Sequence, residues 1–172
     1  MLESIQMEIT KAIVSDASSI MELIKECVSN MKIKGIFQWN EHYPNLEIVN
    51  ADIQAGCAYI TKSDTSCIAT ITLNEEQSPE YQEINWLKDN SKALVVHRLA
   101  IHPSHQNQGL AKRLMFFAEE LAVREGYTSI RLDAYSANPF ALRLYKKLGY
   151  QNLGQIYFPH RELPFVCMEK AL

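Results

Sequence analysis

Strand-like and helix-like segments alternate through the second half of the sequence, and this alternation constrains the fold most strongly. Residues 93–101 form a run of aliphatic and β-branched side chains, and residues 129–135 form another. Between them, residues 109–125 place leucines and a phenylalanine on one helical face. Residues 138–149 predict a further helix, because proline follows the capping asparagine and a glycine ends the pattern. Strands that alternate with helices after a run of strands imply an α/β protein, with a mixed sheet and helices on both faces.

The remaining segments complete a mostly antiparallel, twisted sheet of about seven strands. Apolar residues recur at helical spacing after Asp16, and two β-rich stretches follow Gly56. Residues 74–90 are polar and acid-rich, so we expect a solvated connection that contains at most a short helix. No repeat or linker divides the chain, and we expect a single domain over residues 1–172. The further predicted elements are strands over residues 7–14, 57–61, 65–73, 150–158 and 165–168, and helices between Asp16 and Gly35 and over residues 45–54.

Composition excludes several classes of protein. The chain has 172 residues, with 17 lysines and arginines against 20 aspartates and glutamates, a balance that argues against a general nucleic-acid binder. Residues 1–14 lack the apolar core of a signal peptide, and no apolar run approaches the roughly 20 residues of a membrane span. The four cysteines form no C-x-x-C pair, and His102 and His105 have no cysteine or carboxylate close in sequence. We therefore expect a cytoplasmic protein with reduced thiols and no metal, nucleic-acid or membrane partner.

The turn after the predicted strand 93–101 has the properties of an anion site. The first amide N–H groups of a helix are unpaired, and the helix dipole is positive there. Gly109 would let a phosphate approach the backbone without a Cβ in the way. Residues 90–118 contain no acidic residue, and Lys112 and Arg113 stand in the first turn, where the dipole disfavours cations. A bound anion would explain them; the alternative is a plain strand–turn–helix junction with two solvated basic residues.

Two motifs resemble those of the GNAT superfamily, the Gcn5-related N-acetyltransferases. Gln106-Asn-Gln-Gly109-Leu-Ala111 is similar to the family's Q/R-x-x-G-x-G/A signature, with alanine where many members have a second glycine. Residues 132–150 resemble its N-x-x-A-x-x-x-Y-x-x-x-G-F/Y motif. The resemblance covers roughly residues 95–158. It implies the acyl-CoA N-acyltransferase fold, with the sheet splayed between strands four and five. It also implies acetyl transfer from acetyl-CoA to a primary amine by direct attack in a ternary complex.

The resemblance also implies roles for individual residues. Backbone amides of the signature turn would hold the CoA pyrophosphate, and the pantetheine arm would lie along the strand that precedes it. Asn138 would meet the pantetheine, and Tyr145 would meet the sulfur as acid or hydrogen-bond donor. Asn138 could instead only cap its own helix, and Tyr145 could only pack against neighbouring leucines. The implied cofactor-binding residues are Leu99, Ala100, Ile101, Gln106, Asn107, Gln108, Gly109, Leu110, Ala111, Lys112, Asn138, Ala141 and Tyr145.

His97 and Arg98 are the candidate catalytic and substrate-binding residues of the strand. On ideal alternation His97 shares a face with Leu99 and Ile101, and its reference pKa near 6.5 suits a general base acting through water. The alternative is a strand histidine bonded to the backbone. Arg98 could hold an acidic group of the substrate or pair with a carboxylate of the protein.

The acceptor amine is predicted to bind the segment after the first helix. Trp39, Glu41 and Tyr43 combine aromatic faces with a carboxylate, which suits a cationic amine. Alternatively these aromatic residues cover the sheet edge, and the acceptor is held elsewhere, as by His160-Arg161-Glu162. The acceptor could be a small molecule or a peptide, and the oligomeric state is open, a homodimer included. A non-catalytic acyl-CoA sensor and an interaction module are the alternatives to an enzyme.

Overall fold

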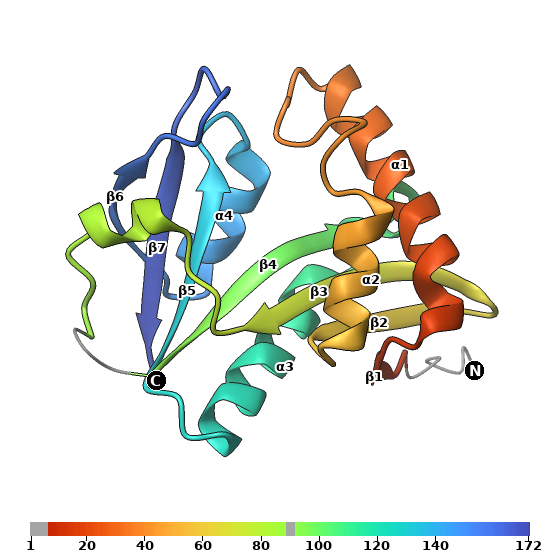
Figure 1. Cartoon of the computed structure of the whole chain (residues 1–172), viewed down its shortest axis with the longest axis horizontal. Coiled ribbons are helices and arrows are strands. Elements are labelled where there is room, and N and C mark those ends of the chain that lie inside the picture. The colour runs from red at the N-terminus through yellow and green to blue at the C-terminus, as the bar shows by residue number, and fades with distance from the viewer. Residues whose placement is uncertain (1–6, 89–91) are drawn as a thin grey trace. The chain divides into compact units, whose positions relative to one another are not determined.

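The computed structural model describes residues 7–88 and 92–172, and the chain forms an α/β fold around one seven-stranded mixed sheet (Figure 1). The strand order is β1-β2-β3-β4-β5-β7-β6, and β4 and β5 run parallel. The strands are β1 (Ile9–Lys11), β2 (Ala58–Ser63), β3 (Ser66–Asn74), β4 (Ala93–Ile101), β5 (Ser129–Tyr135), β6 (Gln151–Ile156) and β7 (Phe165–Ala171). The helices are α1 (Ala17–Ile33), α2 (Leu46–Gln54), α3 (Leu110–Arg124) and α4 (Pro139–Lys147), and the 3-10 helices are η1 (Val14–Asp16), η2 (Pro79–Glu83) and η3 (Pro103–His105).

The predicted fold class is confirmed, and the largest error in the elements is at the first strand. β1 covers three residues rather than the eight of the predicted range 7–14. The chain leaves the sheet early because the Asp16 carboxylate accepts a hydrogen bond from the Ile13 amide at 2.9 Å and closes the turn of η1. At the other end, β7 extends to Ala171, three residues beyond the predicted strand.

The parallel pair β4–β5 is short. Its register joins Ala93–Val95 to Ser129–Arg131, whereas β5 pairs with β7 over seven residues. Further along β4, Arg98 has a φ of 49°, a left-handed conformation that an arginine rarely adopts. A strand with such a residue cannot keep ideal alternation of its side chains. The premise that placed His97 on one face with Leu99 and Ile101 therefore does not hold.

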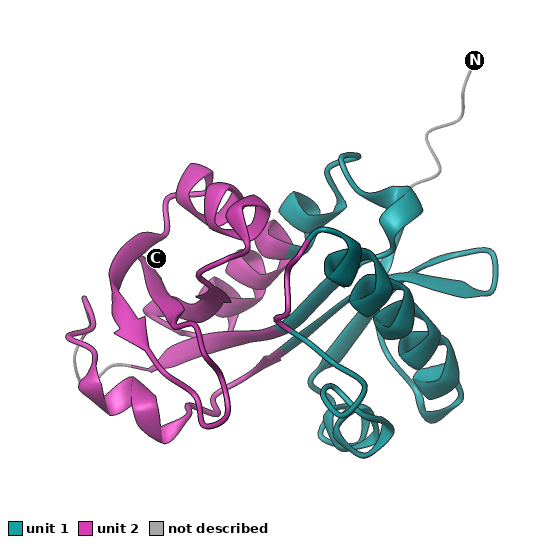
Figure 2. Cartoon of the chain, turned by 90° about the horizontal axis from the view of Figure 1, so that it is seen from above, with its two compact units in different colours: residues 1–34, 39–72, 98–114 teal, residues 35–38, 73–97, 115–172 magenta. Residues whose placement is uncertain are grey.

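The chain divides into two compact units, which are coloured separately in Figure 2. Unit 1 contains residues 7–34, 39–72 and 98–114, and unit 2 contains residues 35–38, 73–88, 92–97 and 115–172. The strands β3 and β4 and the helix α3 each run from one unit into the other. The prediction of one domain over residues 1–172 remains a prediction, and it includes residues 1–6 and 89–91, which lie outside the described parts.

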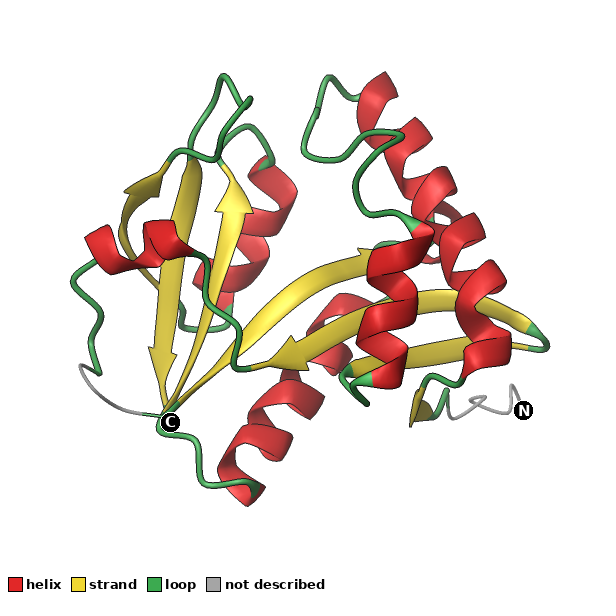
Figure 3. Cartoon of the chain, in the orientation of Figure 1, coloured by secondary structure: helices red, strands yellow, loops and turns green. Residues whose placement is uncertain are grey.

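Unit 1 has its own hydrophobic core beneath two helices. In Figure 3, α1 and α2 cross one face of β2 and β3. α1 buries the predicted face of Ile20, Leu23, Ile24 and Cys27. α2 begins at Asn45, whose side chain accepts a hydrogen bond from the Ile48 amide at 3.0 Å and so caps the helix.

Unit 2 has α4 behind β5, and the short helix η2, drawn in yellow-green, lies in front of β6 and β7 (Figure 1). Its core includes Ile130, Leu132 and Ile156, which are almost fully buried. Residues 74–90 are predicted to be solvated with at most a short helix, and the structure describes this connection over residues 75–88. The short helix is present as η2, but the connection is not merely solvated, because Tyr81 is buried.

Candidate active site

The signature turn, which comprises residues 106–111 of the first motif, presents unpaired backbone amides. Across the described residues, the N–H groups of 107–111 have no acceptor, since α3 begins only at Leu110. Gly109 has a φ of 81° and Asn107 a φ of 61°, so the turn uses two left-handed residues. A Cβ on Gly109 would meet nothing within 4 Å. The glycine is therefore needed for its backbone conformation, and the open space beside it leaves the amides accessible to an anion.

The glutamine side chains of this turn point back into the protein. Gln106 Nε2 donates to the Ile101 carbonyl at 3.2 Å, and Gln108 Nε2 donates to the Ser104 carbonyl at 3.1 Å. Both bonds fix the turn against the end of β4 and η3 without using the backbone N–H groups. Arg113 also has a structural partner, because its Nη2 donates to the Met7 carbonyl at 2.9 Å. A bound anion is therefore not required to explain Arg113.

The end of β4, which is predicted to bind pantetheine, is partly buried and already makes hydrogen bonds within unit 1. Ala100 and Ile101 are buried, and Leu99 is half-buried. The Ile101 carbonyl accepts hydrogen bonds from Gln106 Nε2 and from the Cys27 thiol, the latter at 3.3 Å. Burial is the main cause that raises the pKa of Cys27 to about 12, so this thiol is a neutral donor rather than a nucleophile.

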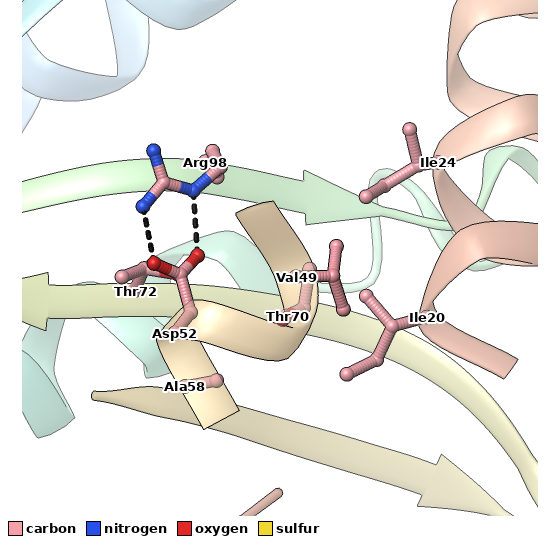
Figure 4. A pocket seen from close by; sticks show the side chains of 8 residues that line it. All are labelled: Ile20, Ile24, Val49, Asp52, Ala58, Thr70, Thr72 and Arg98. Carbon is pink, nitrogen blue, oxygen red and sulfur yellow. Dashed lines mark hydrogen bonds and ion pairs between the residues drawn. The ribbon is translucent and has the colours of Figure 1, made fainter. Parts of the chain in front are cut away.

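Arg98 forms an ion pair with a carboxylate of the protein. Its Nε and Nη2 atoms donate to the two oxygens of Asp52 at 2.7 and 2.6 Å (Figure 4). Its Nη1 donates to the Tyr43 hydroxyl at 3.2 Å. The Thr72 hydroxyl donates to the same carboxylate. Burial disfavours the Arg98 cation, but its bonds to Asp52 outweigh that cost and raise the pKa. Of the two predicted roles, the structure favours the pair with a carboxylate.

A small cavity lies beside this ion pair. Its lining joins the Arg98–Asp52 pair to apolar side chains of α1 and α2, as the close-up shows (Figure 4). Its volume of about 10 Å³ corresponds to roughly one water molecule, too little for an acceptor amine. The lining residues are Ile20, Ile24, Val49, Asp52, Ala58, Thr70, Thr72 and Arg98.

The predicted acceptor segment divides between core and surface. Trp39 lies in the hydrophobic core of unit 1, and Tyr43 packs against that core. Glu41 is exposed, with 82% of its side chain accessible, and its Oε1 lies 3.7 Å from His42 Nε2. Phe37, in unit 2, is 58% exposed. The structure thus favours the alternative for Trp39, which is a packing role, and leaves Glu41 open to a ligand.

Tyr145 lies on α4 and is buried in unit 2. Burial, and next the charge of Asp133, raise its pKa well above 10. Its ring meets that of Tyr150 edge-on, with 6.0 Å between ring centres. No acceptor for the Tyr145 hydroxyl is found within residues 7–88 and 92–172. A neutral phenol with an uncommitted proton is a hydrogen-bond donor.

Asn138 caps α4 and also makes a distant contact. Its Oδ1 accepts a hydrogen bond from the Ala141 amide at 3.1 Å, as the alternative prediction required. Its Nδ2 donates to Gln38 Oε1 at 3.1 Å. The amide group has a second N–H, so the cap does not exclude the predicted pantetheine contact.

His97 lies within hydrogen-bond distance of the backbone of the connection 75–88. Its Nε2 is 3.1 Å from the Glu76 carbonyl, which can only accept. Because a carbonyl only accepts, this bond requires the ring proton on Nε2. This contact matches the alternative prediction of a strand histidine bonded to the backbone, yet it also orients an imidazole for proton transfer.

A buried ion pair that the sequence did not reveal fixes the same connection. Arg131 and Glu169 face each other across β5 and β7, with 8% and 0% of their side chains accessible and 3.1 Å between Nε and Oε1. The Glu169 carboxylate also accepts from the Leu87 amide, and Arg131 donates to the Lys88 carbonyl and to Gln77 Oε1. The sequence signals were a charged residue inside the predicted strand 129–135 and another directly after the predicted strand 165–168.

The aromatic residues of the connection complete this anchorage. The Tyr81 hydroxyl donates to Asp133 Oδ2 at 2.7 Å, and the Trp86 ring lies 4.4 Å from the Arg131 guanidinium. Burial, foremost, raises the pKa of Asp133. The connection that bonds His97 is thus held by polar contacts to two strands of unit 2.

The Acetyltransferase (GNAT) family matches residues 18–150 of the sequence, which is more than three quarters of the chain. The chain belongs to the GNAT family of acetyltransferases. Members of this family are acetyl-CoA-dependent acyltransferases, so the protein is an acetyl-CoA-dependent N-acetyltransferase. The expectation that the two motifs raised is therefore confirmed for the family and the enzyme class.

Known proteins similar to this GNAT chain include bacterial and mammalian N-acetyltransferases. The uncharacterized N-acetyltransferase YesJ of Bacillus subtilis is 27% identical over 146 residues, which cover 83% of this chain and 81% of YesJ. A GNAT acetyltransferase of Streptococcus agalactiae is 26% identical, with a TM-score of 0.82 over 96% of this chain and 95% of that one. The yncA acetyltransferase of Salmonella typhimurium, solved with acetyl-CoA, is 19% identical, with a TM-score of 0.71 over 97% and 94% of the two chains. The last similarity concerns the fold alone.

Two further observations concern what this GNAT chain could bind. In the described ranges, no three histidine, cysteine, aspartate or glutamate side chains are grouped as metal ligands. No helix of the same ranges has the length and apolar character needed to cross a membrane.

Proposed function

We propose that the protein transfers the acetyl group of acetyl-CoA to a primary amine by direct attack within a ternary complex. The observation that carries this proposal is the signature turn, whose unpaired amides and left-handed Gly109 fit a pyrophosphate. Side chains of the turn are held by other contacts, so the backbone of 106–111 would bind the phosphates, with Lys112 beside it. Leu99–Ile101, Asn138 and Ala141 would line the pantetheine arm.

The acceptor must reach the thioester as a free amine. A primary amine with a pKa near 10 is neutral in about one molecule in a thousand at pH 7. The His97 imidazole, oriented by the Glu76 carbonyl, would take the proton through a water molecule. The amine lone pair then forms the C–N bond, the carbonyl electrons move to oxygen, and a backbone amide of β4 would stabilise this oxyanion.

Tyr145 would act on the leaving group. When the oxyanion collapses, the C–S bond breaks, CoA leaves as a thiolate, and the nitrogen gives up its second proton to water to leave the amide. Because the pKa of Tyr145 is well above that of a thiol, near 8.5, full proton transfer to sulfur is uphill. Tyr145 therefore donates a hydrogen bond to the developing thiolate, whose negative charge it stabilises.

The acceptor is a small-molecule or peptide amine, and of the predicted acceptor residues Glu41 keeps that role. Its exposed carboxylate can pair with an ammonium group. Trp39 and Tyr43 would shape the segment from the core, and Arg98 would fix Tyr43 rather than bind a ligand. A cytoplasmic location and the absence of a metal requirement remain predictions.

Replacing Tyr145 with phenylalanine tests the mechanism. The Tyr145→Phe enzyme keeps the packing and loses the donor, so kcat should fall about 10²-fold while the Kd for CoA stays constant. Turnover is measured as release of the CoA thiol with a panel of amines. Tyr150→Phe is the matched control, because it removes a hydroxyl from the adjacent ring, and it should change kcat less than about threefold. Full activity in Tyr145→Phe would exclude the proposed role.

The turn is tested by a pair of substitutions at Gly109. Any side chain there is strained by the φ of 81°, so Gly109→Asp alone would not separate charge from backbone strain. Asparagine has the same shape and tolerates this conformation best among the alternatives. Gly109→Asp should bind CoA at least tenfold more weakly than Gly109→Asn in calorimetry, since the carboxylate repels the phosphates. Equal affinities would place the phosphates elsewhere.

A further inference from the structure

Arg161 lies in unit 2 where three distant segments meet. Its Nη1 donates to the Phe37 carbonyl at 3.1 Å, and the neighbouring Gln38 side chain accepts from Asn138 at 3.1 Å. Residues 35–38 therefore lie between the β6–β7 connection and the start of α4, all within the magenta unit of Figure 2. Because Asn138 is the proposed pantetheine contact, this meeting point is close to the reacting end of the cosubstrate.

Two nitrogens of the Arg161 guanidinium, Nε and Nη2, have donors without an acceptor in the described part of the chain. The bond to Phe37 uses one N–H of Nη1, and among the described residues Nε and Nη2 of Arg161 have no acceptor. In Arg98 the same Nε–Nη2 edge carries the bidentate Asp52 carboxylate. Arg161 thus presents a planar edge of two parallel donors whose direction is fixed by a backbone carbonyl, which is the geometry that binds a carboxylate.

The surroundings favour an anion. Residues 134–161 contain no aspartate or glutamate, although 20 acidic residues in 172 predict about three in a segment of this length. The same segment carries Arg143, Lys146 and Lys147 besides Arg161, and the exposed carboxylate of Glu162 follows directly. One acidic neighbour does not balance this positive charge, and no ion pair to Arg161 is present within residues 7–88 and 92–172.

Exposed aromatic side chains belong to the same three segments. Phe37 is 58% accessible, Phe140 in the first turn of α4 is 56% accessible, and Tyr157 before the β6–β7 connection is 62% accessible. Exposed apolar side chains on the segments that meet at an arginine with unused donors are typical of a ligand site with an apolar wall and one orienting charge.

We propose that Arg161, with Phe37 and Phe140, binds the carboxylate and apolar group of the acceptor, so that the acceptor is an amine that also carries a carboxylate. This inference rests on the proposed acetyl transfer and specifies its second substrate. The ligand could be a free amino acid or the end of a short peptide, since both offer the same carboxylate. His160 and Glu162 flank the arginine but are not needed for the contact of Nε and Nη2 with the carboxylate.

The experiment compares four acceptors with the intact protein and acetyl-CoA. They are L-phenylalanine, its amide, phenethylamine, and the dipeptide L-alanyl-L-phenylalanine. Wild-type kcat/KM should be at least tenfold higher for phenylalanine or the dipeptide than for the two acceptors without a carboxylate, and whichever of the two is preferred identifies the source. For the preferred acceptor with a carboxylate, Arg161→Gln should raise KM and so lower kcat/KM at least 30-fold. For phenethylamine, the same substitution should change kcat/KM less than threefold.

The matched control is Arg143→Gln, which removes the same charge from an exposed residue of α4 and should leave the preference unchanged. An equal loss for all four acceptors in Arg161→Gln would mean that Arg161 only holds the Phe37 backbone, and would overturn the inference. Turnover without any preference for a carboxylate would also overturn it, while leaving acetyl transfer intact. If neither these acceptors nor a wider amine panel released CoA, the proposed function itself would fail.

Discussion

Two arginine–carboxylate pairs among residues 7–88 and 92–172, one buried and one half-buried, have the same chemistry but different surroundings. Arg131 and Glu169 occupy facing positions of two neighbouring strands, and every remaining polar atom is bonded to the connection 75–88 or to Ser129. Arg98 and Asp52 join a strand to a helix, and 12% of each side chain is still accessible. The first pair holds backbone in place, whereas the second closes a contact between side chains.

This difference determines what each pair contributes. A buried ion pair gains little net stability over an apolar pair of similar volume, because both charges must be desolvated. Removing one partner is nevertheless costly, since the other charge stays buried. The penalty should be largest where backbone groups also lose their partner, as at Glu169, and smaller where water can reach the remaining charge, as at Asp52.

The largest effect is expected from Glu169→Gln. The substitution keeps the volume but leaves the Arg131 guanidinium buried without a counter-charge, and weakens the bond to the Leu87 amide. We expect the free energy of unfolding to fall by about 3–5 kcal/mol. Urea denaturation followed by circular dichroism measures this, with the exposed Glu125→Gln as control. A loss below about 1 kcal/mol would contradict the anchoring role.

An intermediate effect is expected from Arg98→Met, which should lower the free energy of unfolding by about 2–3 kcal/mol. Adding Asp52→Leu should restore most of that loss, because the second charge is removed with the first. The corresponding double substitution of Arg131 and Glu169 should not recover, since the Leu87 amide and the Lys88 carbonyl stay without partners. Equal recovery in both doubles would remove the distinction between the pairs.

The smallest effect is expected from a third pair, Asp16 with Lys62, in which the lysine is 39% accessible and the atoms are 2.5 Å apart. Burial raises the pKa of Asp16, but the Ile13 amide and Lys62 outweigh it, so the net pKa lies below the ordinary 3.8. A depressed carboxyl pKa stabilises the fold above about pH 4 and loses that contribution as the pH falls through the folded value.

Lys62→Met should therefore reduce stability at pH 7 by less than about 1 kcal/mol and move the acid-induced loss of stability to higher pH. Unfolding free energies measured between pH 3 and pH 7 test this, with the exposed Lys25→Met as control. If Lys62→Met lost stability over the same pH range as the wild type, the Ile13 bond alone would set the pKa of Asp16.

The sequence by itself determined the elements and residues that depend on short-range contacts. The left-handed Gly109, the Asn138 cap and the two-turn spacing to Tyr145 follow from bonds and periodicities within a few residues, which sequence patterns report directly. The same holds for the buried face of α1. These residues carry the two motifs, so family and enzyme class could also be inferred before the structure.

Only the tertiary structure decided which partners the charged and polar side chains have. Arg98 meets a carboxylate 46 positions away, Leu87 meets one 82 positions away, and Asn138 reaches Gln38 across 100 positions. No periodicity marks such pairs, because a buried arginine can be satisfied by any carboxylate or carbonyl that the packing brings near. The polar composition of the connection 75–88 likewise predicted solvent contact, since composition does not reveal that strand residues of the interior supply its hydrogen bonds.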